Sequence, residues 1–129
     1  MIVIDASAII DALLVTEDME SLVAIADAED WHAAPNFIDV EFLSGLRRLE
    51  LGGHITAARA RSAIADFQLF NLLRFDVSEL VSDIWRLRHN VSTYDAAYVA
   101  LARLLDIRVI TRDRKLAKTT GHTAVITIL

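Results

Sequence analysis

The chain has 129 residues, with four glycines, one proline and no cysteine, which excludes disulfides, zinc–thiolate sites and thiol nucleophiles. The formal charge of -5 is unevenly spread, because residues 1–46 contain no lysine or arginine and all 13 basic residues follow them. This asymmetry is compatible with nucleic-acid contact or a cation-binding acidic site, and equally with helix faces that merely differ in composition.

Short apolar strands alternate with helices along the chain. The predicted elements, in chain order, are a strand over 1–5, helices over 7–15 and 18–29, a strand over 31–34, helices over 36–50 and 55–69, a strand over 71–75, helices over 76–88 and 92–105, a strand over 108–111, a short helix over 113–118 and a strand over 124–128. The alternation predicts an α/β fold with a central parallel sheet of about five strands covered on both faces. The length of the chain predicts one domain over 1–129. No apolar run reaches the length of a membrane span, so we expect a location in the cytoplasm and no membrane partner.

Apolar periodicity predicts which side chains are buried. One stripe of the 92–105 helix consists of Tyr94, Tyr98, Leu101 and Leu105. The apolar side of the 76–88 helix consists of Val77, Leu80, Val81, Ile84 and Leu87. We expect the core to include Trp31, Phe67, Phe70, Phe75 and Trp85. The histidines show no metal-ligand spacing, and we expect surface or loop positions for His32, His54, His89 and His122.

Four acidic residues stand where an α/β fold places its chemistry. Asp5 and Asp113 each follow a predicted strand, at the sheet edge where ligands bind, although an N-cap would explain either one. Asp95 lies on or beside the inward stripe of its helix, where a carboxylate is costly without a partner; a capping box is the alternative. Glu41 and Asp39 flank opposite edges of the apolar stripe in 36–50, and periodicity does not choose between them.

A convergence of Asp5, Glu41, Asp95 and Asp113 would require a cation, because ionised carboxylates in one small volume repel one another. Oxygen-only ligation selects hard divalent ions, Mg²⁺ or Mn²⁺. Two such ions about 4 Å apart support attack of water on a phosphodiester. If these acids converge, the set would therefore indicate a metal-dependent hydrolase acting on a phosphodiester.

Further polar residues could assist such a site. Ser7 and Thr111 could orient a carboxylate or a water molecule, or could simply be a cap and a strand residue. Arg112, Arg114 and Lys115 crowd around Asp113 and could hold RNA phosphates, or could form a solvated helix end.

Four blocks in this order resemble PIN-domain ribonucleases, and specifically the VapC toxins of type II toxin–antitoxin pairs. The blocks are Ile2–Ser7, Pro35–Arg48, Thr93–Leu101 and Val109–Asp113. The resemblance implies a three-layer αβα fold with Asp5, Glu41, Asp95 and Asp113 as the metal-binding catalytic acids, and it selects Glu41 over Asp39. It also implies a homodimer that cleaves structured RNA such as tRNA or rRNA with Mg²⁺ or Mn²⁺, and a cognate VapB-type antitoxin that inhibits it.

Two other classes of function compete with this interpretation. A PIN-like module could bind RNA or protein without catalysis, but such a module would need no cluster of four acids. A receiver-type domain built around Asp5 would need an acidic pair at the end of the first strand, and Ile4-Asp5 supplies one acid. A nucleotide site of the P-loop or dinucleotide type is excluded because the chain has no glycine-rich phosphate loop.

Overall fold

The computed structural model describes residues 1–14 and 31–128. Five parallel strands form one sheet in the order β3-β2-β1-β4-β5. The strands are β1 (Ile2–Ile4), β2 (His32–Pro35), β3 (Leu72–Phe75), β4 (Val109–Thr111) and β5 (Ile126–Ile128). The all-parallel α/β sheet expected from the sequence is confirmed.

The strand order puts the first strand at the centre of the sheet. Val3 of β1 pairs with Ala33 of β2 on one side and with Val109 of β4 on the other. All three residues of β1 are buried, as its unbroken apolar sequence predicts for a strand covered on both faces. The edge strands β3 and β5 are only partly buried. Asp5 therefore leaves the sheet from its middle, beside the end of β4.

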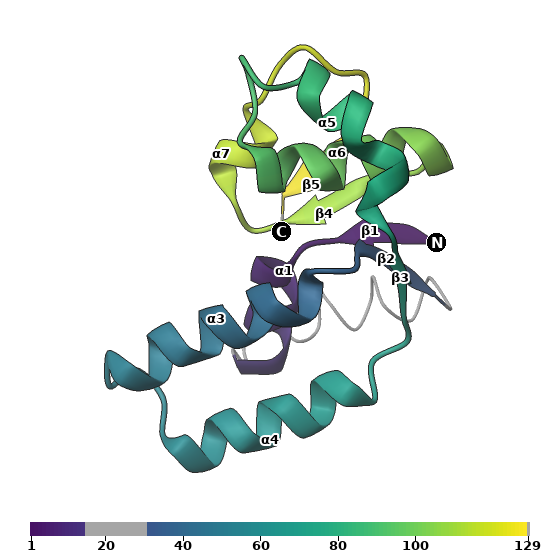
Figure 1. Ribbon diagram of the computed structural model, residues 1–129. Helices are drawn as coiled ribbons and strands as arrows, with labels where there is room; N and C mark the ends of the chain where they lie inside the picture. The colour runs from purple at the N-terminus through teal and green to yellow at the C-terminus, as the bar shows by residue number, and fades with distance from the viewer. Residues whose placement is uncertain (15–30, 129) are drawn as a thin grey trace.

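Helices cover both faces of this sheet (Figure 1). One layer holds α1 (Ala6–Leu14), α3 (Ile38–Leu51) and α4 (Ala57–Gln68), which contact one another. The other layer holds α5 (Val81–Arg86), preceded by the 3₁₀ turn η1 (Val77–Leu80), and α6 (Thr93–Leu105), which packs on β1, β2 and β4. The short helix α7 (Arg114–Ala117) follows β4 and contacts β5. This is the three-layer αβα arrangement expected from the resemblance.

The middle of α6 is the most deeply buried helical segment in the part of the chain that the structure describes. Every residue from 96 to 102 is buried, four of them alanines, so the helix approaches the sheet closely. Ser92 caps its first turn, and Asp106 ends it in the left-handed region at φ 53°. Asp95, in the first turn of α6, is thereby held at a fixed place beside the sheet.

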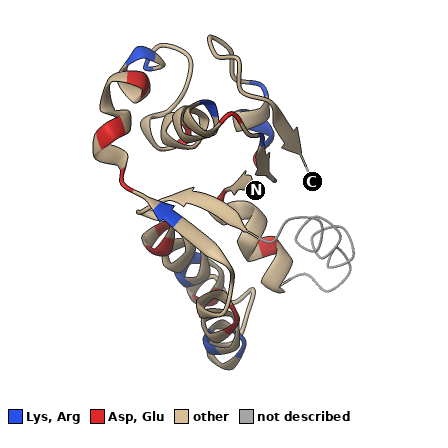
Figure 2. Ribbon diagram, turned by 90° about the vertical axis from the view of Figure 1, so that its right-hand side faces the viewer, with Lys and Arg blue, Asp and Glu red and all other residues tan. Residues whose placement is uncertain are grey.

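The charged residues of the helices are mixed in sign. Figure 2 shows both acidic and basic positions on α3 and on α4. Six of the ten acids that make residues 1–46 so acidic fall in 15–30, outside the described residues. The predicted helix over 18–29 also lies outside them. No helix in 1–14 or 31–128 has the length and apolarity to cross a bilayer.

Some expectations about burial were wrong. Trp31 and Trp85 are 48% and 67% exposed, because Trp31 precedes β2 and Trp85 stands on the outer side of α5. His32, expected at the surface, lies in the buried strand β2 against the Phe70 ring. Val81 is also exposed, because the predicted helix over 76–88 begins as the tighter 3₁₀ turn η1, which shifts the face that α5 presents.

Candidate active site

The four acids singled out from the sequence line one cavity. Asp5 follows β1, Glu41 lies on α3, Asp95 on α6, and Asp113 caps α7 just beyond β4. The cavity has a volume of about 570 Å³ and opens at the carboxyl edge of the parallel strands, where α/β proteins bind ligands. Its remaining lining residues are Ala6, Ser7, Ile10, Phe37, Val40, Ser44, Gly45, Arg48, Tyr94 and Tyr98.

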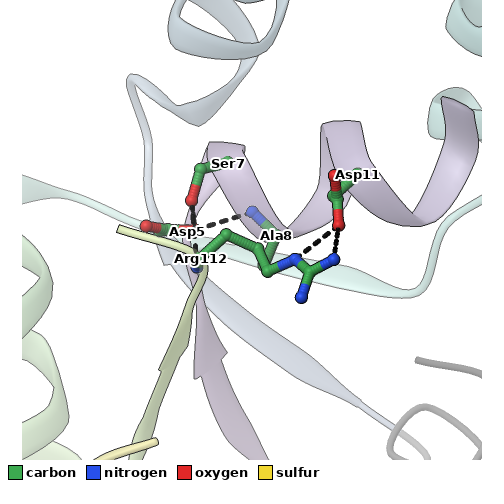
Figure 3. A network of polar contacts seen from close by, with 5 residues as sticks. All are labelled: Asp5, Ser7, Ala8, Asp11 and Arg112. Carbon is green, nitrogen blue, oxygen red and sulfur yellow. Dashed lines mark hydrogen bonds and ion pairs between the residues drawn. The ribbon is translucent and has the colours of Figure 1, made fainter. Parts of the chain in front are cut away.

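Asp5 is the most constrained acid of the cavity. One carboxylate oxygen accepts hydrogen bonds from the Ser7 hydroxyl and the Ala8 amide, both at 2.8 Å. The other oxygen accepts a short hydrogen bond from Thr111. Figure 3 shows how Ser7 and Ala8 converge on Asp5 from the first turn of α1.

Ser7 and Thr111 also connect Asp5 to the chain that follows β4. The Ser7 hydroxyl accepts from the Arg112 amide at 3.2 Å, a contact visible in Figure 3. The Thr111 hydroxyl accepts from the Asp113 amide at 2.8 Å while donating to Asp5. Both hydroxyls therefore hold Asp5 and the Asp113 segment in one arrangement, the orienting role considered for them from the sequence.

Glu41 and Asp39 point in different directions from α3. The Glu41 carboxylate accepts a short hydrogen bond from the buried Tyr98 hydroxyl of α6 and lines the cavity. Asp39 forms a two-bond ion pair with Arg74 of β3, both bonds 2.7 Å long. The choice that helical periodicity left open is thus made by the partners of the two side chains.

Asp95 and Asp113 each form hydrogen bonds at the N-terminus of a helix, and each also lines the cavity. The Ser92 hydroxyl donates to Asp95 at 2.7 Å, and the Asp95 amide donates back to Ser92 at 3.3 Å. The Asp113 carboxylate accepts from the Lys115 amide at 2.7 Å. The capping alternatives considered from the sequence are therefore present, and both carboxylates still border the cavity.

Electrostatics within the cavity disfavour negative charge. Burial raises the pKa of Asp5, and the neighbouring Asp113 adds to this effect, while the hydrogen bonds from Thr111, Ala8 and Ser7 oppose it. Burial likewise raises the pKa of Glu41, with repulsion from Asp5 and Asp95 added and the Tyr98 bond opposing. A bound cation would offset this repulsion.

The donor chemistry of the cavity fits a hard divalent cation. Among the described residues that line it, the ionisable ligands are carboxylates, with no sulfur and no histidine. In 1–14 and 31–128, however, no three acidic or histidine side chains stand at the spacing of a metal site. Each of the four carboxylates is bonded to a protein donor. In Glu41, Asp95 and Asp113 the bonds within the described residues use one oxygen, which leaves the second oxygen for a cation.

The basic residues proposed for RNA contact differ in their surroundings. The Arg112 side chain is held by Asp11 of α1 in a short ion pair, drawn in Figure 3. Arg114 and Lys115 are exposed on α7, and neither lines the cavity. Arg48 of α3, which was not among the expected RNA-binding residues, does line it.

Comparison with known proteins decides the family. The model of the PIN domain matches residues 2–121. Ribonuclease VapC9 of Mycobacterium tuberculosis is 40% identical over 129 residues, covering 100% of this chain and 98% of that protein. The chain belongs to the PIN-domain family of VapC ribonucleases.

Solved structures share the fold of this VapC-family chain. VapBC2 from Rickettsia felis, bound to a DNA fragment from its promoter, superposes with a TM-score of 0.70 at 12% identity, over 99% of this chain and 98% of that one. VapC20 of Mycobacterium tuberculosis, a sarcin–ricin loop cleaving toxin, gives 0.63 at 18% identity, over 97% and 98%. At these identities the likeness concerns the fold alone.

Several residues of the VapC-family cavity were not recognised from the sequence as part of a site. Apolar periodicity places Tyr98 in the stripe of its helix, whereas in the structure the Tyr98 hydroxyl donates a hydrogen bond to the Glu41 carboxylate. Tyr94, assigned to the same stripe, is 61% exposed at the cavity because it stands in the first turn, before α6 passes under the sheet. The signal available was the adjacency of Tyr94 to Asp95 and the spacing of Asp95 to Tyr98.

Proposed function

We propose that this protein is a metal-dependent endoribonuclease toxin that hydrolyses a phosphodiester of structured RNA, either tRNA or rRNA. The observation that carries the proposal is the meeting of Asp5, Glu41, Asp95 and Asp113, from four separate segments of a VapC-family chain, around one cavity. The proposal places these acids as ligands of Mg²⁺ or Mn²⁺. It also includes a cytoplasmic location, where such RNA is found.

Some residues of the cavity would bind the cations, and others hold these ligands in position. Bound divalent ions would supply a lowered pKa for the attacking water and would offset charge on the phosphate. Asp5 is fixed by three donors before any ligand arrives, so it provides the rigid member of the set. Burial and the Glu41 carboxylate raise the pKa of Tyr98, which therefore stays protonated and keeps its hydroxyl donating to Glu41.

A protein partner and a second copy belong to the same proposal. VapBC2 and a complex from Klebsiella pneumoniae are toxin–antitoxin assemblies that share this fold. We infer that a VapB-type antitoxin neutralises this chain and that the toxin is a homodimer. The exposed apolar side chains, such as Leu51, Leu69 and Val81, offer surface for such contacts.

The decisive assay is cleavage of end-labelled total tRNA and rRNA by the purified protein with Mn²⁺ or with EDTA. Discrete products with Mn²⁺ alone are expected. Asp95→Asn should reduce cleavage at least about 100-fold, since loss of a metal ligand costs more than loss of an outer partner. The fold should survive, because an asparagine still accepts the Ser92 bond.

Asp66→Asn is the matched control, because Asp66 is exposed on α4 and does not line the cavity. Equal cleavage by Asp95→Asn and Asp66→Asn would remove Asp95 from the site. Absence of products from the wild-type protein with either RNA would favour the module that binds without catalysis.

A further inference from the structure

The cavity of the candidate nuclease has two chemically different ends along α3. Phe37 immediately precedes α3, Glu41 stands in its first turns, and Arg48 follows seven residues later, about 10 Å further along the axis. Tyr94 joins Phe37 at the first end. Along α3, Glu41 thus lies between an aromatic end and a basic end of the cavity.

Tyr94 forms a fixed aromatic surface that faces solvent. Its ring meets Phe37 edge-on at 5.2 Å between centroids, and Phe37 meets the buried Tyr98 at 5.8 Å. Within the described residues the Tyr94 hydroxyl has no hydrogen-bond partner, and the side chain is 61% exposed. An exposed ring held in place beside a phosphodiesterase site is the surface on which an RNA base stacks.

Arg48 is the basic member of the cavity lining. It is exposed and, among residues 1–14 and 31–128, takes part in no ion pair despite the four carboxylates around the same cavity. Between Glu41 and Arg48 the cavity wall is formed on α3 by Ser44 and Gly45, whose side chains are small or absent. A guanidinium in this setting binds a phosphate through two parallel hydrogen bonds and offsets the repulsion between the acids and an RNA backbone.

Resting on the proposed function, we propose that Tyr94 and Arg48 position the RNA: Tyr94 stacks on a base, and Arg48 binds a backbone phosphate at the other end of the cavity. The strand then lies along α3, and the reacting phosphate lies over the acids between these two contacts. The competing occupant is a segment of the antitoxin. At its own end of the cavity, the charge of Arg48 favours RNA, because a guanidinium attracts a phosphate and repels a cationic side chain.

Binding can be separated from cleavage in the Asp95→Asn background, with a short fluorescein-labelled oligoadenylate as the probe and anisotropy as the readout. Tyr94→Ala should weaken binding about 5- to 150-fold, the range found for removal of one stacked base contact. Tyr94→Phe should bind like the parent, because it keeps the ring. Trp85→Ala is the matched control, since Trp85 is equally exposed but stands on α5, away from the cavity.

The contribution of Arg48 has a different signature. Arg48→Ala should weaken binding and reduce the slope of log affinity against log salt by about 0.7, the value for one phosphate contact on a single strand. Arg47→Ala is its control, because Arg47 is the adjacent exposed arginine and does not line the cavity.

An abasic probe with the same ribose-phosphate backbone distinguishes the two roles. Tyr94→Ala should lose its effect on this probe, whereas Arg48→Ala should keep its effect. Unchanged binding in both variants, or weakened inhibition by the antitoxin with unchanged RNA binding, would overturn the proposal. Either result leaves the proposed function standing if the protein with Asp95 intact still cleaves RNA with Mn²⁺.

Discussion

Single hydroxyl groups determine how the candidate acids are held. Thr111 is fully buried, donates to Asp5 and accepts from the Asp113 amide, so one oxygen atom serves two acidic segments. The Tyr98 hydroxyl donates to Glu41 from the other layer. Because these donors favour one orientation of each carboxylate, the site depends on side chains that carry no charge of their own.

Thr111→Val should therefore lower RNA cleavage about 10- to 100-fold while conserving side-chain shape, because Asp5 loses a donor and the Asp113 amide loses its acceptor. Stability should fall by about 1–3 kcal/mol, the cost of leaving buried polar groups unsatisfied. Thr111→Ser should restore both properties. Urea denaturation and initial cleavage rates measure them, and Thr111→Val with wild-type cleavage would show that Thr111 has no positioning role.

At the level of the residue, sequence patterns singled out four acids that the structure gathers around one cavity, but the patterns did not indicate the partners of these acids. Asp5 and Asp113 could be placed because a parallel sheet brings the ends of its strands to one edge. The ion pair between Asp39 and Arg74 could not, because it joins α3 to an edge strand 35 residues away. The bond from Tyr98 to Glu41 spans 57 residues and lies outside any local pattern for the same reason.

The packing of α1 against α3 depends on the absence of a side chain at Gly45. A Cβ built at this position would stand 2.2 Å from the Cδ1 atom of Ile10 on α1. Both residues line the cavity, so this contact also sets how far α3 lies from Asp5. The close approach explains a glycine in the interior of a helix, where it costs about 1 kcal/mol relative to alanine.

Gly45→Ala should have two opposing effects on the free energy of unfolding. Helix propensity should raise it by about 1 kcal/mol, and overpacking should lower it by about 1–3 kcal/mol. Ile10→Val removes the offending methyl group and should relieve the cost. We expect Gly45→Ala to be more favourable by at least about 1 kcal/mol in the Ile10→Val background. Denaturation of the four proteins of this double-mutant cycle measures the coupling, and strict additivity would contradict the steric account.

Helix and strand positions followed well from the sequence, whereas the faces of some elements did not. Gly52 and Gly53 end α3 at Leu51 as the pattern indicated. The tryptophans were misplaced because hydrophobicity alone does not distinguish a core residue from one on the outside of a short helix such as α5. The strand order could not be deduced, since β1 pairs with β4 across more than 100 residues.

For the whole molecule, the acidic cavity opposes folding in the absence of a cation. Burial raises the pKa values of Asp5 and Glu41, so the folded state holds their protons more tightly than the unfolded chain does. Their contribution to stability is complete below the unfolded pKa values, near pH 4, and is lost as pH rises through the folded values. At neutral pH the fold therefore carries an electrostatic strain that divalent ions should relieve.

Glu41→Gln should accordingly raise the melting temperature at neutral pH in EDTA, and should reduce the further rise that millimolar Mn²⁺ produces in the wild-type protein. Asp39→Asn on the same helix is the matched control and should lower the melting temperature at neutral pH. The Arg74 bonds lower the pKa of Asp39, so its contribution is present above the unfolded pKa and lost as pH falls. A fall in melting temperature for Glu41→Gln would contradict the account.

The central position of β1 has a consequence for synthesis. The cavity requires Asp5, which follows the first strand, and Asp113, which lies just beyond the fourth. The hydrogen bond from Thr111 to the Asp5 carboxylate joins residues that are 106 positions apart in the sequence. A ribosome making this protein thus carries a chain without the cavity until the segment that contains Thr111 and Asp113 has emerged. A nuclease built in this way cannot assemble its site on the RNA-rich particle that makes it before both of these distant segments have left that particle.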